Sequence, residues 1–270
     1  MKPNLTLILL LCFTVFITIS CRKFVSYNAD EARVKTKFQD LNKKNIDKLK
    51  LSPEKDSFSF LVISDSQRAY KELDDFVSTV NQLKNNEFVI LNGDITDFGL
   101  NSEYEWIAER LQNLLIPYIV VIGNHDMLAN GRDIYRQMFG VENFSFEVTN
   151  FKFIFLNSNS REVGLDGSLP DLNWLRNELN TAAVGQKIIV VSHIAPFSGD
   201  FDHSLEMSYS QMLTENRNVL YSIHGHEAKY IHGQPYGPPV TYLVSNSLNS
   251  RSYVLFKING DDIQVEEKFF

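Results

Sequence analysis

The chain has 270 residues, of which 44% are hydrophobic and 22% are charged, and its formal net charge is -7. This length is sufficient for one large hydrophobic core, or for a core with appended segments. Proteins that bind long nucleic acids usually carry a basic surface, so the acidic balance argues against a nucleic-acid partner. An anionic substrate would instead need a local positive site, which a bound metal ion could supply.

The first 21 residues, MKPNLTLILLLCFTVFITISC, have the pattern of a signal peptide. A basic Lys2 precedes an apolar run from Leu5 to Ile19, which is shorter than the about 20 residues of a comfortable membrane span. TISC resembles the lipobox of bacterial lipoproteins, so Cys21 is the predicted lipidation site. A plainly cleaved signal and an uncleaved anchor are the alternatives. We therefore expect a membrane-anchored lipoprotein of the bacterial cell envelope, or otherwise a secreted or periplasmic protein.

Residues 22–57 are polar and charged, and they end in NKKNIDKLKLSPEKD. This composition predicts a solvated tether with room for one short helix. The only two cysteines, Cys12 and Cys21, precede the tether. The predicted folded domain, residues 58–270, therefore has neither disulfides nor a cysteine-rich zinc site.

From Phe58 onward, apolar runs typical of buried strands alternate with segments of helical spacing. Strands are predicted at 58–64, 87–92, 118–123, 186–192 and 218–223, with helices at 71–84, 102–114 and 171–180. A hairpin is predicted at 143–159, and residues 239–270 alternate like antiparallel strands. This order predicts an α/β domain in which two packed sheets have helices on the outside.

The predicted strands end in polar residues that suit metal binding. The blocks are Asp65-Ser66-Gln67, Gly93-Asp94, Gly123-Asn124-His125-Asp126, Ser192-His193 and His224-Gly225-His226. In open α/β sheets, ligands bind beyond the carboxyl ends of the strands. Carboxylates gathered in one crevice repel each other unless cations neutralise them, and mixed oxygen and imidazole ligands suit Zn, Fe or Mn. The pattern therefore predicts a metal site.

Four of these blocks resemble the signature blocks of calcineurin-like metallophosphoesterases, in the same order and at similar spacing. They are GDITD at 93–97, GNHD at 123–126, VSHIAP at 191–196 and HGHEA at 224–228. The resemblance extends from about Phe58 to the C-terminus. It implies a four-layer α/β fold, with two packed mixed β-sheets flanked by helices. It also implies hydrolysis of phosphate mono- or diesters with divalent metal ions (Mn, Fe, Zn or Mg; one or two per chain).

The resemblance further implies roles for individual residues around two ions, which lie about 3.5–4 Å apart in two-metal sites. The implied metal ligands are Asp94 as the bridging carboxylate, Asn124, His193 and His226 at the second ion, and Asp65 at the first. A metal-activated hydroxide would attack phosphorus, while His125 would bind the phosphoryl oxygens or protonate the leaving oxygen, oriented by Asp126. Asp97 would support these residues without binding metal.

Two positions depart from the family pattern. Gln67 and Ala228 stand where the family has histidines, and both of those histidines would serve the first ion. This ion's site is therefore expected to be weakened or remodelled. Gln67 can still coordinate through its amide oxygen, a hard ligand better suited to Mg or Mn than to Zn.

The segment HGH at 224–226 allows two alignments with the family's closing block. The alignment on Gly225 makes His226 the ligand and leaves His224 as a neighbour that supports the site. In the alternative alignment, the loop shifts by two residues and both His224 and His226 bind metal.

The sequence thus leads to two functional hypotheses. The first is an envelope metallophosphoesterase that acts on a phosphorylated small molecule or a lipid-linked phosphate, is held at the membrane by a lipid anchor, and has no nucleic-acid substrate. The alternative is a weakly active or inactive phosphate-binding lipoprotein that has lost one metal site.

Overall fold

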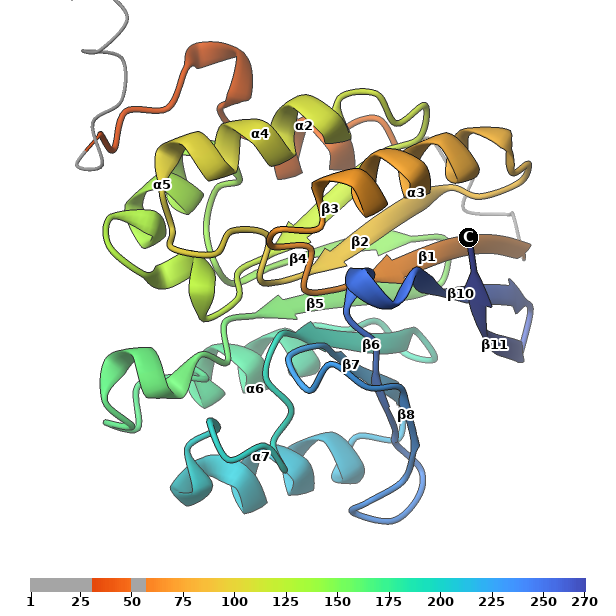
Figure 1. Ribbon diagram of the computed structural model, residues 1–270. Coiled ribbons are helices and arrows are strands. Elements are labelled where there is room, and N and C mark those ends of the chain that lie inside the picture. Colours follow the sequence, from red (N-terminus) through yellow and green to blue (C-terminus); the bar gives the residue numbers. More distant parts are fainter. Residues whose placement is uncertain (1–30, 50–56) are drawn as a thin grey trace, which may run out of the picture. The chain divides into compact units, whose positions relative to one another are not determined.

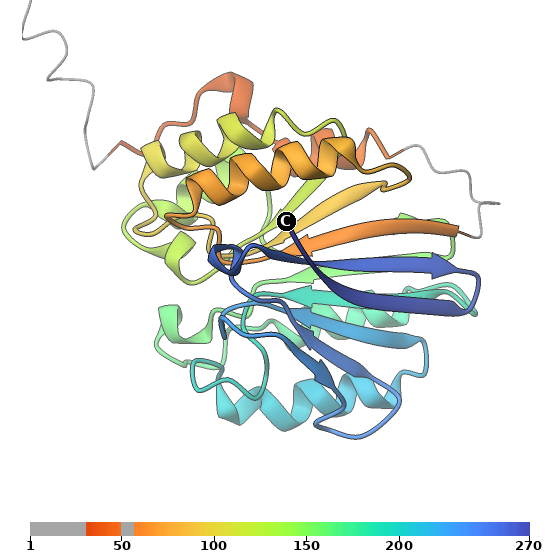
Figure 2. The same ribbon diagram turned by 45° about the vertical axis from the view of Figure 1, so that its right-hand side comes forward.

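Two mixed β-sheets pack face to face, and helices cover the outer face of each sheet (Figures 1 and 2). The structure is a computed structural model that describes residues 31–49 and 57–270. The predicted signal peptide and Cys21 lie outside the described residues. The predicted four-layer α/β architecture is confirmed.

The first sheet has five strands in the order β11-β10-β1-β2-β3. Its parallel strands are β1 (Ser57–Ile63), β2 (Phe88–Asn92) and β3 (Tyr118–Val121). The antiparallel hairpin of β10 (Ser252–Asn259) and β11 (Asp262–Phe269) extends the sheet beyond β1. Strands that are covered on both faces have near-continuous apolar sequences, which is why the pattern located the parallel strands.

The second sheet has six strands in the order β4-β5-β6-β7-β9-β8. The predicted hairpin is confirmed as β4 (Phe144–Val148) and β5 (Phe151–Leu156). Parallel to β5 run β6 (Lys187–Ser192), β7 (Val219–His224) and β9 (Thr241–Val244). The short antiparallel strand β8 (Ile231–Gly233) forms one edge.

Five longer helices cover the two sheets (Figure 1). Over the first sheet lie α3 (Tyr70–Gln82), α4 (Asn101–Leu111) and α5 (Gly131–Met138), and over the second lie α6 (Leu172–Asn180) and α7 (His203–Glu215). Short 3-10 turns occur at η1 (Thr36–Phe38), η2 (His125–Met127), η3 (Ser160–Val163) and η4 (Leu248–Ser250). Within residues 31–49 and 57–270, no helix has the length and apolarity to cross a bilayer.

The apolar pattern did not predict α7 because few of its side chains face the core. Only Tyr209, Ser210 and Leu213 of this helix are buried. Its start is instead determined by Asp202, whose carboxylate accepts a hydrogen bond from the main-chain nitrogen of Ser204 (2.9 Å).

Aromatic side chains fill the space between the sheets. The ring of Phe60 on β1 stacks on Phe88 of β2 (centroids 5.2 Å apart) and on Phe256 of β10 (4.5 Å). Across the interface, Phe153 of β5 meets Phe60 edge-on at 5.3 Å. Complete burial of such a side chain contributes about 1.5–3 kcal/mol, so this cluster strongly favours the face-to-face packing of the sheets.

Residues 34–46 differ from the predicted tether, because they fold against the first sheet and its helices. Val34, Phe38 and Leu41 are buried in the core that α3, α4 and the first sheet share. Val34 precedes the 3-10 turn η1, Phe38 ends it, and Leu41 begins the helix α2 (Leu41–Ile46), so three short pieces of chain each bury one side chain. No helical periodicity links these three residues and lysines surround them, so the sequence did not indicate their burial, and the folded domain begins earlier than predicted.

Asn42 on α2 covers the edge of the first sheet. Its side-chain amide donates to the main-chain oxygen of Val120 on β3, and its Oδ1 accepts from the Val120 nitrogen, both at 2.8 Å. The side chain therefore satisfies the main-chain groups that an unpaired edge strand would leave open. It ties the N-terminal segment to the strand that leads to Asn124.

We expect Asn42→Ala to lower the free energy of unfolding by about 1–3 kcal/mol, because it leaves the buried main-chain nitrogen of Val120 without a partner and its oxygen with only the Tyr135 hydroxyl (2.7 Å). Denaturant unfolding measures this change. Lys43→Ala is the matched control on the same helix, since Lys43 is exposed and pairs only with Asp47, and it should change stability by less than about 0.5 kcal/mol. Equal stability of Asn42→Ala and the wild type would show that the segment is not docked.

Candidate metal centre at the carboxyl ends of the strands

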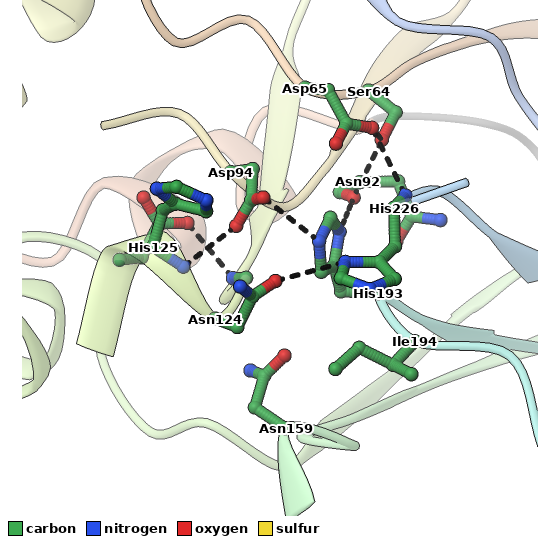
Figure 3. Close-up of polar contacts among 12 residues, drawn as sticks. Ser64, Asp65, Asn92, Asp94, Asn124, His125, Asn159, His193, Ile194 and His226 are labelled. Atoms are coloured by element: carbon green, nitrogen blue, oxygen red, sulfur yellow. Dashed lines mark hydrogen bonds and ion pairs between the residues drawn. The ribbon is translucent and has the colours of Figure 1, made fainter. Parts of the chain in front are cut away.

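The loops that follow the parallel strands of both sheets meet at one edge of the domain. Main-chain hydrogen bonds join them, from Asp65 nitrogen to Gly93 oxygen (3.1 Å) and from Gly225 nitrogen to His193 oxygen (2.9 Å). Between the sheets, His193 Nδ1 donates to the main-chain oxygen of Asn92 at 2.7 Å. The polar strand ends singled out in the sequence are therefore neighbours (Figure 3).

Two glycines allow these loops to approach closely. A Cβ at Gly93 would lie 2.4 Å from Nδ1 of His193, and one at Gly123 would lie 2.1 Å from the main-chain nitrogen of Asp94. Gly93 also has φ of +83°, a conformation that other residues rarely adopt. Glycine is therefore required at both positions for Asp94 to reach the ring of His193.

Asp94, His193 and His226 form a compact group of metal-ligating side chains. One ligand atom from each lies within 4.8 Å of the others. Asp94 Oδ2 is 3.3 Å from His193 Nε2, and Asn124 Oδ1 is 3.1 Å from His226 Nδ1, so the carboxamide joins the group. Figure 3 shows these four side chains pointing toward one another. The structure thus brings together all four residues expected at the second ion.

In each imidazole ring, the nitrogen that faces away from the donor group is bound by an acceptor. His193 uses Nδ1 for the Asn92 carbonyl, so Nε2 faces Asp94. His226 uses Nε2 for the carboxylate of Asp200 at 3.2 Å, and Asp200 is in turn paired with Arg161 at 2.6 Å. Metal-binding histidines usually donate their other ring nitrogen to a carbonyl or carboxylate in this way. The rings are therefore presented as metal ligands.

The electrostatics of the group favour bound positive charge. Burial opposes a charge on His193, but the neighbouring Asp94 carboxylate outweighs it and raises the pKa of His193 to about 10. Burial also opposes ionisation of Asp94, yet His193 holds its pKa below the ordinary value. Burial raises the pKa of Asp65, and the charge of Asp94 adds to this effect. Two buried carboxylates without a cation nearby would repel each other, so the group is suited to a divalent ion.

The donor set fits a metal on one side of Asp94. One carboxylate, one amide oxygen and two imidazoles are ligands typical of Zn, Fe or Mn. Nε2 of His193 is buried and has no well-aligned hydrogen bond within the described residues, as expected of an atom that coordinates a cation.

On the other side of Asp94 the donor set is only partial. Asp65 Oδ2 accepts a short hydrogen bond from the Ser64 hydroxyl and another from the main-chain nitrogen of His226 (3.1 Å). Gln67 Oε1 is buried without a hydrogen-bond partner in the part of the chain that the structure describes. Ala228 is exposed and offers no ligand atom. This side therefore has oxygen donors only.

His125 stands next to Asp94 at the start of η2. Its main-chain nitrogen donates to Asp94 Oδ1 (2.9 Å), and its ring Nδ1 donates to the main-chain oxygen of Asp97 (2.8 Å). Burial opposes a charge on the ring, but the Asp97 carbonyl and the Asp94 carboxylate outweigh it and raise the pKa of His125. Because Nδ1 is engaged, Nε2 is the ring nitrogen that remains for a ligand.

The prediction that Asp126 orients the His125 ring is wrong. The Asp126 carboxylate is completely buried and accepts hydrogen bonds from the main-chain nitrogens of Ile95 (3.1 Å), Thr96 (2.8 Å) and Gly123 (2.9 Å). It therefore fastens the loop after β2 to the loop after β3, while the carbonyl of Asp97 orients the ring. A sequence motif does not show in which direction a neighbouring carboxylate points.

Asp97 and His224 do not lie among the clustered ligands. The Asp97 carboxylate pairs with Arg68 (2.6 Å), and the main-chain oxygen of Asp97, not its carboxylate, accepts the hydrogen bond of the His125 ring. Both ring nitrogens of His224 lie near serine hydroxyls, 3.2 Å from Ser192 and 2.8 Å from Ser222. Burial lowers the pKa of His224 to about 3. The structure therefore agrees with the alignment on Gly225, in which His226 is the ligand and His224 is a neutral neighbour.

Sequence reasoning missed Asp200 and Asn159. Asp200 lies in the loop after β6 and reaches His226 on the loop after β7, and no spacing in the sequence indicates this contact. Asn159 follows β5 in the segment LNSN, and its position beside Asn124 depends on how β5 lies relative to β3 (Figure 3).

Residues 58–230 match the calcineurin-like phosphoesterase family, and this match covers more than half of the chain. The chain therefore belongs to that family.

Two curated relatives carry phosphodiesterase names. A probable glycerophosphodiester phosphodiesterase from Arcobacter nitrofigilis is 29% identical over 145 residues, which cover 50% of this chain and 51% of the relative. A probable cyclic nucleotide phosphodiesterase from Ruthia magnifica is 25% identical over 181 residues, covering 62% of this chain and 72% of the relative. The first alignment thus spans only about half of the relative's length.

Solved structures share the fold. A dimetal phosphatase from Danio rerio has a TM-score of 0.63 at 14% identity, covering 78% of this chain and 95% of that protein. A purple acid phosphatase from yellow lupin seeds has a TM-score of 0.66 at 11% identity, covering 80% of this chain and 52% of that protein. A fold of this kind implies divalent metal ions, and the donor set described above fits them.

We expect Asp94→Asn to lower the metal content of the purified protein, because it removes the buried negative charge on which the donor group depends. Elemental analysis and calorimetric titration with Mn²⁺ measure the change. Asp97→Asn is the matched control, since it makes the same isosteric change in the same loop on a carboxylate that pairs with Arg68. If both variants retained the metal equally, Asp94 would not be a ligand.

Proposed function

We propose that this protein is a metal-dependent hydrolase of phosphate mono- or diesters. The convergence of Asp94, Asn124, His193 and His226 carries the proposal, because their donor atoms form one group with acceptors that orient both rings. Membership of the calcineurin-like phosphoesterase family and the phosphodiesterase names of the relatives support it. A bound divalent cation would supply Lewis-acid polarisation of the phosphoryl group and activation of water.

The residues of this chain then have separate tasks in the proposed reaction. Asp94, His193 and His226 hold the cation, and Asp200 and the Asn92 carbonyl keep the two rings in place. His125 is held at both its main-chain nitrogen and its Nδ1, so its Nε2 can bind a phosphoryl oxygen or give a proton to the leaving oxygen. A raised pKa keeps more of the ring protonated, which suits both roles.

The proposed substrate is a phosphorylated small molecule or a lipid-linked phosphate. The relatives' names mention glycerophosphodiesters and cyclic nucleotides, which are small diesters. The net charge of -7 disfavours a long nucleic acid, because a polyanion would be repelled away from the metal centre.

We also propose that Cys21 carries a lipid and that the protein is anchored in the bacterial cell envelope. The apolar run from Leu5 to Ile19 and the lipobox-like TISC support this location.

A second candidate function is phosphate binding with little or no turnover. The all-oxygen donor set on the Asp65 side favours it, because Gln67 and Ala228 replace two imidazoles of the family pattern. Binding close to two metal ions per chain, together with hydrolysis of model esters, supports the enzyme. One ion without turnover supports the binding protein.

We expect His125→Gln to reduce kcat for a nitrophenyl phosphodiester by about 100-fold or more, the scale of general acid catalysis, while metal content stays unchanged. Steady-state kinetics and elemental analysis on the same preparation measure the two quantities. His203→Gln is the matched control, because His203 is exposed and its Nδ1 contacts Glu206 at 3.0 Å, away from the donor group. Unchanged kcat in His125→Gln would remove this residue from the mechanism.

We expect the double variant Gln67→His with Ala228→His to bind metal more tightly on the Asp65 side, because it adds two imidazole donors there. Position 228 has φ of +48°, a conformation that histidine tolerates better than most residues. Calorimetric titration with Mn²⁺ gives stoichiometry and affinity. If neither changed, positions 67 and 228 would not belong to one metal site.

A further inference from the structure

Asn159 has a buried acceptor atom with no donor in the described part of the chain. The side chain is completely buried, and its Oδ1 accepts no hydrogen bond there. It lies in the loop after β5, and Figure 3 shows it directed toward Asn124 with Ile194 beside it. A buried polar atom without a partner costs about 1–3 kcal/mol. Such an atom beside a metal centre calls for a functional explanation.

The direction of the Asn159 carboxamide is determined by its own hydrogen bonds. Its Nδ2 donates to the main-chain oxygen of Ile122 (3.0 Å) and to Oδ1 of Asn157 (2.9 Å). A reversed amide would place Oδ1 against these two oxygens. Nδ2 is therefore committed to the protein, and Oδ1 is left as the free acceptor. The bond to Ile122 also ties Asn159 to the strand end that leads to Asn124.

Asn157 is held in turn by an ionic cluster. Its Nδ2 donates to Oε2 of Glu142 (2.8 Å), and its Oδ1 also accepts from the main-chain nitrogen of Asn159 (2.9 Å). Glu142 is bound by both Arg132 (2.7 and 2.8 Å) and Arg136 (2.8 Å). Because a carboxylate only accepts, Asn157 cannot reverse, and neither can Asn159. A continuous series of hydrogen bonds from α5 thus sets the direction of Oδ1.

Asn159 is directed toward Asn124, whose carboxamide could use such an acceptor (Figure 3). A carboxamide that binds a cation must direct Oδ1 toward it. An acceptor bound to Nδ2 then fixes this orientation, because the reversed amide would place Oδ1 against that acceptor. In this structure Asn124 Oδ1 lies near Nδ1 of His226. Two ligand atoms of one ion lie about this far apart, since metal–ligand bonds are about 2.0–2.2 Å long, so Asn124 already presents Oδ1 as a ligand would.

We propose that Asn159 is a positioning residue for Asn124: its Oδ1 accepts a hydrogen bond from Asn124 Nδ2 when Asn124 binds metal through Oδ1. The inference rests on the proposed function only in taking Asn124 as a metal ligand. Glu142 and Asn157 determine the direction of the acceptor. Groups that orient metal ligands in this way typically change metal affinity by 10–100-fold when removed.

The test is titration of the purified metal-depleted protein with Mn²⁺. Calorimetry gives the Kd, and the electron paramagnetic resonance spectrum reports the surroundings of the bound Mn²⁺. Asn159→Leu keeps the approximate shape and removes the acceptor, so we expect Kd to rise about 10–100-fold. Asn159→Asp keeps an acceptor but loses the donations to Ile122 and Asn157, so we expect lower thermal stability with Kd within about threefold of the wild type. Asn159→Ala repeats the test if the leucine variant does not fold.

Asn101→Leu is the matched control. Asn101 is a buried asparagine whose Oδ1 also lacks a partner among the described residues, but it lies at the start of α4. The Asn101→Leu variant should be less stable than the wild type and should bind Mn²⁺ with the wild-type Kd. An unchanged Kd in folded Asn159→Leu overturns the proposal. If the same variant also has a raised KM for a hydroxyl-bearing substrate, Asn159 binds substrate instead of positioning Asn124. If the wild type itself binds no Mn²⁺, the metal centre of the proposed function is wrong, and this inference falls with it.

Discussion

The contact between the buried Asp94 carboxylate and the His193 ring joins the two halves of this domain. Asp94 follows β2 of the first sheet and His193 follows β6 of the second. Their side chains are 3% and 0% exposed, and Oδ2 of Asp94 lies 3.3 Å from Nε2 of His193. Neither group is stable as an isolated charge in such surroundings. The aromatic packing between the sheets brings them together, and their opposite charges then offset the desolvation that burial imposes.

The loops around this contact are held by groups that do not themselves bind metal. Asp126 receives three main-chain donors and thereby couples the loops after β2 and β3. The Asn92 carbonyl and Asp200 orient the two imidazoles. The site is therefore rigid because its supporting contacts cross between strands, and a cation would meet ligands whose geometry is already largely determined.

The two sides of Asp94 differ in chemistry. The side with Asn124, His193 and His226 has nitrogen and oxygen donors together. The side with Asp65 offers only oxygen donors among the described residues, the Asp65 carboxylate and the Gln67 amide oxygen, because Ala228 has no ligand atom. An amide oxygen beside a carboxylate suits a hard cation such as Mg or Mn, so the two sides of Asp94 differ in the cations that they favour.

The sequence by itself determined most of the strands, three of the five longer helices, the residues of the donor group and the family, because apolar periodicity and strand-end motifs are local properties. It did not determine which way the Asp126 carboxylate points, that Val34, Phe38 and Leu41 are buried, or that Asp200 and Asn159 reach the centre. Those features depend on contacts between segments far apart in the chain. Only the tertiary structure decided them, because the direction of a side chain follows from the partners that packing places around it.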